Sequence, residues 1–152
     1  MADLWSVVIG GALAVGGSAA TQWYLHAAKS ADDRRRLREQ KLEELIALVY
    51  EHDHWMDNLR VINVFGKEER RTISPFSKLN AIAAIHFPEF LPSIKKLDHA
   101  ASEYRHWMIT KGRQRLVGNF DALGEGFEEA YEPYLSASSQ LLDEIQAFSQ
   151  RA

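Results

Sequence analysis

The strongest constraint on this chain is an uncharged stretch over residues 4–28, which contains no Asp, Glu, Lys or Arg and ends at an arginine-rich segment. A helix of this length, rising about 1.5 Å per residue, reaches across a hydrocarbon layer of roughly 30 Å. Trp5 lies near one end of the stretch, and Trp23 and Tyr24 lie near the other, where aromatic side chains favour the membrane interface. We therefore expect a transmembrane anchor over residues 1–28.

Two other interpretations of this stretch stay open. A cleaved signal peptide normally begins with a basic region, whereas this chain begins Met-Ala-Asp. A helix buried in a globular protein normally shows one polar face. Neither pattern fits the stretch well, so the retained membrane helix is the main expectation.

The basic residues that follow the stretch predict its orientation. Residues 2 and 3 carry no basic residue. Residues 29–41 carry six, namely Lys29, Arg34, Arg35, Arg36, Arg38 and Lys41. Positive charge is retained on the cytoplasmic side, so we expect a single-pass protein with its N-terminus outside and its C-terminal domain in the cytoplasm. We take the membrane to be a bacterial inner (plasma) membrane. Four of these arginines are also expected to contact anionic lipid head groups, namely Arg34, Arg35, Arg36 and Arg38.

Small residues dominate the middle of the predicted anchor. They recur at a spacing of four and form ridges on which two helix backbones can approach closely: Gly10, Ala12, Ala14, Gly16 and Ala20. We expect these ridges to mediate self-association, which would make the protein a homo-oligomer. The alternative is a passive anchor that merely tolerates Gly and Ala.

The rest of the chain predicts an all-α fold. No Gly or Pro occurs from Ser18 to Phe65, so one helix is expected to run from the anchor to near Asn63, where Gly66 follows. A second helix is expected after the Ser74 cap and to stop at Pro88. We expect residues 29–41 to form a basic juxtamembrane helix and residues 42–152 to form a cytoplasmic antiparallel bundle of three or four helices.

Two further helices complete the expected bundle. The third is expected from Pro92 to a stop at Gly112, and the fourth from a cap at Asn119 to about Gln150. Three residues weaken the first half of the fourth helix and predict a bend or a late start there: Gly124, Gly126 and Pro133. The expected core stripes are Leu42, Leu45, Val49, His52, Met56, Leu59 and Asn63; Phe76, Leu79, Ile82, Ala83 and Ile85; Ile94, Leu97, Ala101, Tyr104 and Met108; and Leu123, Phe127, Ala130, Tyr134, Leu141, Ile145 and Phe148.

Composition excludes several classes of activity. The chain holds 18 Lys and Arg against 21 Asp and Glu, and the acidic excess falls in the bundle, which argues against nucleic acid as a partner. There is no cysteine, which excludes disulfides, thiol catalysis and cysteine-ligated zinc. No phosphate-binding loop or nucleophile motif occurs. We expect no enzymatic activity, no catalytic residue and no cofactor.

One repeated pattern has to be weighed as a metal site. Residues 51–56 and 103–108 share Glu, His, Trp and Met at the same positions, so Glu51-x-x-His54 matches Glu103-x-x-His106. Two such motifs are half of the ligand set of a di-metal carboxylate bundle. However, the 100° rotation per residue turns these side chains away from the apolar stripes. We expect no metal site and keep a di-metal enzyme as a remote alternative.

His52 lies on the first apolar stripe itself. We expect it to be a buried histidine that bonds to a carbonyl or to a tyrosine such as Tyr104 or Tyr134.

The connections of an up-down bundle predict one further surface. The first and third connections lie at the same end of such a bundle, and together they carry Lys67, Arg70, Arg71, Lys111, Arg113 and Arg115. This basic end is the candidate site for an anionic partner. The alternative is that these residues only complement the C-termini of the helices.

These patterns favour a membrane-anchored helical protein-interaction module that self-associates through the Gly/Ala-rich helix. Its expected partners are membrane lipids, further copies of the chain and an unidentified cytoplasmic protein. The main alternative is a membrane-disrupting, pore- or lesion-forming effector that uses the bundle as a sensor.

Overall fold

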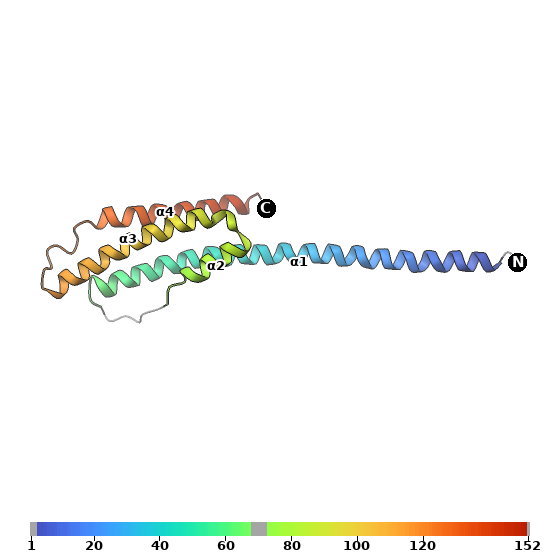
Figure 1. Cartoon of the computed structure of the whole chain (residues 1–152), viewed down its shortest axis with the longest axis horizontal. Coiled ribbons are helices and arrows are strands. Elements are labelled where there is room, and N and C mark those ends of the chain that lie inside the picture. The colour runs from blue at the N-terminus through green and yellow to red at the C-terminus, as the bar shows by residue number, and fades with distance from the viewer. Residues whose placement is uncertain (1–2, 68–72, 152) are drawn as a thin grey trace. The chain divides into compact units, whose positions relative to one another are not determined.

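A computed structural model describes residues 3–67 and 73–151, with side chains described at residue 29 and over residues 32–67 and 73–151. This part of the chain is all-helical: α1 (Asp3–Asn63), α2 (Phe76–His86), the 3₁₀ turn η1 (Pro88–Phe90), α3 (Leu91–Leu116) and α4 (Phe127–Ser149) (Figure 1). The chain divides into two compact units, Met1–Gln40 and Lys41–Ala152, and α1 contributes to both. The expected all-α class is confirmed.

The second unit is a helical bundle. Within it, the last part of α1 and α3 run in the same direction, while α4 runs the opposite way beside them (Figure 1). Helix α2 is short and covers only part of their length, and the ion pair between Lys78 and Glu44 (2.8 Å) joins it to α1. The structure is therefore three long helices with a short fourth, within the range expected from the sequence.

The core of the bundle follows the predicted 3.6-residue periodicity closely. The buried apolar residues include Leu45, Val49, Met56, Leu79, Ile94, Leu97, Tyr104, Met108, Leu141 and Ile145. All five residues of the stripe predicted for α3 are buried. Because burying an apolar side chain of this size contributes about 1.5–3 kcal/mol, these stripes are the main source of the bundle's stability.

The prediction for one residue of α2 was wrong. Ile85 is 74% exposed, whereas Phe87, just past the end of the helix, is fully buried. The helix ends at His86, and Phe87 has φ −144° and ψ 60°, which turns its ring inward. There the ring meets those of Phe90 and Phe148, with centroids 5.9 Å away in both cases. The change of backbone conformation at the helix end moved the core position from residue 85 to residue 87.

The expected stop of the third helix at Gly112 was also wrong. Helix α3 continues to Leu116, and the chain turns at Gly118, which has φ +80°. Gly112 is buried inside the helix, where a Cβ atom would lie 2.9 Å from the carbonyl oxygen of Asn63. This glycine therefore permits close packing of α1 against α3 rather than ending a helix.

The fourth helix starts later than its expected cap. Asn119 lies in the connection, and α4 begins at Phe127 after Gly126, whose φ of 72° belongs to the left-handed region. Pro133 lies within α4 without ending it. The late start anticipated from Gly124, Gly126 and Pro133 is confirmed, and it leaves a ten-residue connection over residues 117–126.

Among the residues that the structure describes, no helix is both long and apolar enough to cross a membrane. The predicted span, residues 4–28, lies outside the described side chains.

Gly112→Ala tests the close packing of α1 on α3. In an ordinary helix interior this change stabilises by about 1 kcal/mol. Here the added methyl group would press on a backbone carbonyl, and overpacking costs about 1–3 kcal/mol, so we expect a net loss of about 1 kcal/mol in urea unfolding of the full chain. Gly124→Ala is the control, since nothing lies within 4 Å of a Cβ there. A gain in stability for Gly112→Ala equal to the ordinary helix value would contradict the close packing.

Candidate functional site

The residues predicted to act at the membrane lie in the first unit. The small-residue ridges Gly10, Ala12, Ala14, Gly16 and Ala20 fall outside the described side chains. The four arginines at positions 34, 35, 36 and 38 are exposed on α1. Arg35 pairs with Glu39 and Arg36 pairs with Asp32, each at 3.0 Å and one helical turn away. These pairs are solvent-exposed and each contributes well under 1 kcal/mol.

The predicted basic end is only partly assembled from described residues. Lys67 and Arg113 are exposed. Arg115 is half-buried beside Gly66, where its guanidinium would lie 1.9 Å from an added Cβ. Arg70 and Arg71 lie outside the described residues.

Lys111 is placed differently from the other basic residues. It is buried, and its ammonium donates a hydrogen bond to the carbonyl oxygen of Ala122 (2.6 Å) and lies 3.9 Å from the carboxylate of Glu125. Its charge therefore holds the connection that precedes α4 rather than facing solvent at the end of the bundle.

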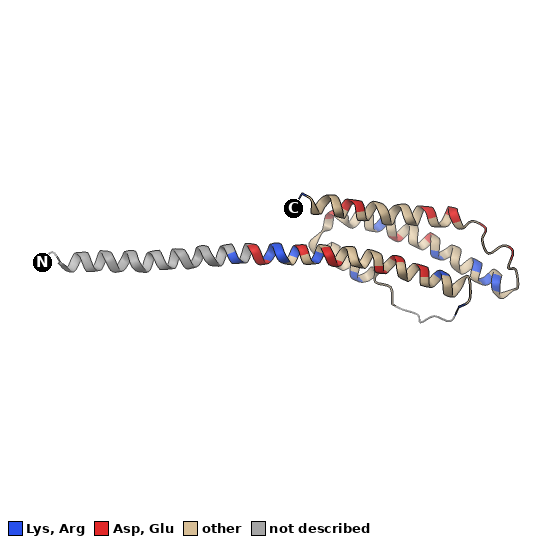
Figure 2. Cartoon of the chain, turned by 180° about the vertical axis from the view of Figure 1, so that it is seen from behind, with Lys and Arg blue, Asp and Glu red and all other residues tan. Residues whose placement is uncertain are grey.

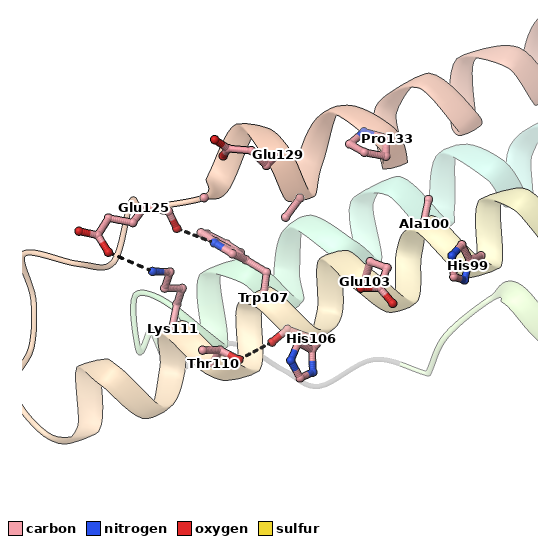
Figure 3. Close-up of a pocket in the computed structure, with 12 residues that line it drawn as sticks. His99, Ala100, Glu103, His106, Trp107, Thr110, Lys111, Glu125, Glu129 and Pro133 are labelled. Carbon is pink, nitrogen blue, oxygen red and sulfur yellow. Dashed lines mark hydrogen bonds and ion pairs between the residues drawn. The ribbon is translucent and has the colours of Figure 1, made fainter.

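An open groove with a volume of about 600 Å³ lies between α3 and α4. We call it the α3–α4 groove. Its α3 wall carries His99, Glu103, His106, Trp107 and Thr110, and its α4 side carries Glu125, Glu129 and Pro133 (Figure 3).

One end of the groove is formed by the connection that precedes the late start of α4, and two hydrogen bonds hold this connection to α3. The indole N–H of Trp107 donates a hydrogen bond to the backbone carbonyl of Glu125 (2.9 Å), while Lys111 holds the same segment beside it (Figure 3). These two bonds fix the end of the groove and the orientation of the indole ring. The cavity is thus a formed feature of the fold.

The charge of the groove is negative. Glu103, Glu125 and Glu129 are exposed along it, and the one lysine in its lining is already paired with Glu125. An aromatic ring beside carboxylates suits a cationic group, since the ring face and the carboxylates both attract positive charge. The groove therefore fits a Lys or Arg side chain better than an anion.

The Glu-x-x-His motifs do not converge. Glu51 and His54 line a separate pocket of about 220 Å³ beside Trp55, while Glu103 and His106 face the α3–α4 groove, and all four side chains are exposed. Within the described residues, no three His, Asp or Glu side chains lie close enough to hold a metal ion.

A buried polar cluster joins α1 to α4, and the sequence analysis missed it. The hydroxyl of Tyr134 donates to the carboxylate of Asp53, and the hydroxyl of Ser138 donates to both oxygens of the same carboxylate (3.1 Å each). Burial raises the pKa of Asp53, although the hydrogen bonds from Tyr134 and Ser138 act in the opposite direction. Burial also raises the pKa of Tyr134, and the carboxylate of Asp53 raises it further. Ser138 continues the apolar stripe of α4 at helical spacing, which was the available signal for a buried partner.

His52 is buried as expected, with 2% of its surface exposed, but its predicted hydrogen bond was wrong. Neither ring nitrogen has a hydrogen-bond partner among the described residues. The ring instead packs between aromatic rings: Trp55 stacks on it (5.6 Å between centroids), and Phe76 (5.3 Å) and Tyr134 (6.1 Å) meet it at an angle. Tyr134 gives its hydroxyl to Asp53 instead, because that carboxylate is a stronger acceptor.

The two repeated segments hold equivalent positions in the bundle. Trp55 stacks on His52, and Trp107 stacks on Tyr104 in the same way (5.9 Å, 23° between planes). Both tryptophans are half-buried and pack at the edge of the core. Comparisons with known protein families, with curated proteins and with solved structures found no match to this chain.

The burial of His52 predicts a loss of stability in acid. Burial, with a smaller effect from the charge of Arg105, lowers the pKa of His52 to about 4. Between the unfolded value near 6.5 and about 4, the unfolded chain binds a proton that the folded chain does not, so stability falls as the pH falls. We expect the free energy of unfolding to drop by about 2 kcal/mol between pH 7 and pH 5 from this group.

His52→Phe isolates this effect, because it removes the titrating ring and keeps the aromatic packing. Urea unfolding of the full chain at both pH values measures it. The variant should lose about 2 kcal/mol less than wild type on acidification. Equal losses in both proteins would show that His52 is not held neutral in the fold.

Proposed function

We propose that this protein is a non-enzymatic, membrane-anchored interaction module that binds a cytoplasmic protein through its bundle. The observation that carries the proposal is the α3–α4 groove, an open cavity of about 600 Å³ with an indole and three carboxylates in its lining. The partner that suits this lining is a protein segment that presents a Lys or Arg side chain. The aliphatic stem of such a side chain packs on the ring while its charge meets the carboxylates.

The anchoring part of the proposal rests on the sequence of the first unit. Residues 4–28 would span the membrane, and Arg34, Arg35, Arg36 and Arg38 would lie at the cytoplasmic head groups. Self-association would follow from the small-residue ridges of the same segment. The bundle would then be presented to its partner in more than one copy, which strengthens binding to a repeated or multivalent target.

A photo-crosslinking amino acid at position 103 tests the groove in the full chain. Glu103 faces the groove, and the matched control is position 98, because Asp98 is an exposed acidic residue on another face of α3. We expect a protein to be cross-linked from position 103 and not from position 98. Adding Glu129→Lys should lower that yield about tenfold, since a like charge would then repel a basic segment. The same products from both positions, or no loss with Glu129→Lys, would exclude the groove as the binding site.

Gly16→Leu tests self-association and separates the module from a membrane-disrupting effector. The larger side chain would keep the helix backbones apart, so dimer or oligomer formation in mild detergent should weaken about tenfold. Val15→Leu is the control, because position 15 lies outside the small-residue ridges. Expression of the wild type should leave the membrane potential of the cell unchanged. Depolarisation that Gly16→Leu relieves would instead favour the effector.

A further inference from the structure

Four large apolar side chains gather at one end of the bundle and face solvent. Leu116, Val117 and Phe120 lie where α3 passes into its connection to α4, and Phe65 follows the end of α1; they are between 58% and 81% exposed. Gly66 lies against Arg115, which places the ends of α1 and α3 side by side. We call these four residues the apolar cap. Exposed apolar groups gathered in this way mark a surface that binds something.

The backbone that carries the cap is held in place. The N–H groups of Val117, Gly118 and Asn119 donate to the carbonyls of Arg113, Arg115 and Gln114, at 3.3, 3.0 and 3.0 Å. Their hydrogen bonds are therefore made within the protein. These three donors would therefore not be left unpaired in an apolar medium.

Basic residues surround the apolar cap. Arg113 and Lys67 are exposed, Arg115 lies beside Gly66, and Arg113 forms no ion pair with any residue that the structure describes. Figure 2 shows the lysines and arginines at the end of α3, where the chain turns towards α4. The same connection carries two exposed acidic residues, Asp121 and Glu125, and Glu125 is paired with Lys111. The end of the bundle is thus apolar at its tip and basic around it.

We propose that the apolar cap inserts shallowly into the surface of an anionic lipid bilayer. A bilayer surface takes up both parts at once, since the apolar side chains reach the acyl boundary while Arg113 and Lys67 meet the phosphates. The four apolar side chains are more than half exposed, and the basic residues beside them have the charge that anionic head groups attract. The inference goes beyond the proposed function, because the cap and the groove involve different residues.

The chain enters the bundle at the other end from the cap. Within the second unit, α1 runs from Lys41 to Asn63 and reaches the cap only at its C-terminus (Figure 1). The cap therefore lies at the end of the second unit that is away from Lys41.

The absence of cysteine makes a site-specific test straightforward. Val117→Cys carries an environment-sensitive fluorophore on the cap, and Ile85→Cys carries it at an equally exposed apolar site on α2. The full chain is kept soluble in an amphipathic polymer and mixed with vesicles of phosphatidylcholine, with or without phosphatidylglycerol. We expect a blue shift and brightening at position 117 only with the anionic vesicles, and no change at position 85.

A charge reversal tests the part of the basic residues beside the apolar cap, and it is made in the labelled Val117→Cys protein. Arg113→Glu should lower the affinity for anionic vesicles about tenfold, while Lys96→Glu, an exposed control on the same helix, should not. An unchanged signal at position 117, or an equal response to neutral vesicles, would overturn the proposal. A response to polyglutamate but not to vesicles would overturn it in favour of an acidic protein. A fluorescence change at position 117 that depends on the protein concentration and occurs without vesicles would overturn the proposal, because the cap would then bind a second copy of the chain.

Discussion

The bundle depends on the burial of one face of α1 against α3 and α4. Leu45, Val49 and Met56 on that face are almost completely removed from water. Helix α2 meets α1 at the Lys78–Glu44 ion pair and at the contact between the Phe76 and His52 rings. Helices α3 and α4 meet it at Gly112 and at Tyr134. At about 25 cal/mol per Å² of apolar surface, this shared core outweighs any single polar contact in the fold.

Polar contacts then determine how the helices are aligned along one another. The carboxylate of Asp53 accepts hydrogen bonds from Tyr134 and Ser138, so α1 and α4 meet at one register. An apolar core alone tolerates small shifts between helices, whereas a partly buried carboxylate loses stabilising hydrogen bonds when its donors move away. Gly112 has a comparable effect on α1 and α3, because the carbonyl of Asn63 fits only where a side chain is absent.

Both proposed surfaces follow from the way in which two helices end. Helix α3 runs past Gly112 to Leu116 and so carries apolar residues beyond the end of α1. Helix α4 begins only at Phe127. Lys111 and Trp107 form hydrogen bonds to the connection between α3 and α4, and the groove lies beside Glu103. The groove is acidic and basic residues lie beside the apolar cap, so the two surfaces suit partners of opposite charge.

The sequence by itself determined the helical class, most of the core stripes and the breaks at Gly66 and Pro88, because these depend on 3.6-residue periodicity and on local backbone chemistry. It also determined that Glu51, His54, Glu103 and His106 face away from the stripes. Only the tertiary structure decided that Gly112 is a packing contact, that Asp53 bonds to Tyr134 and that His52 has no bonded partner. These features depend on distances between helices, which the periodicity of each helix does not specify.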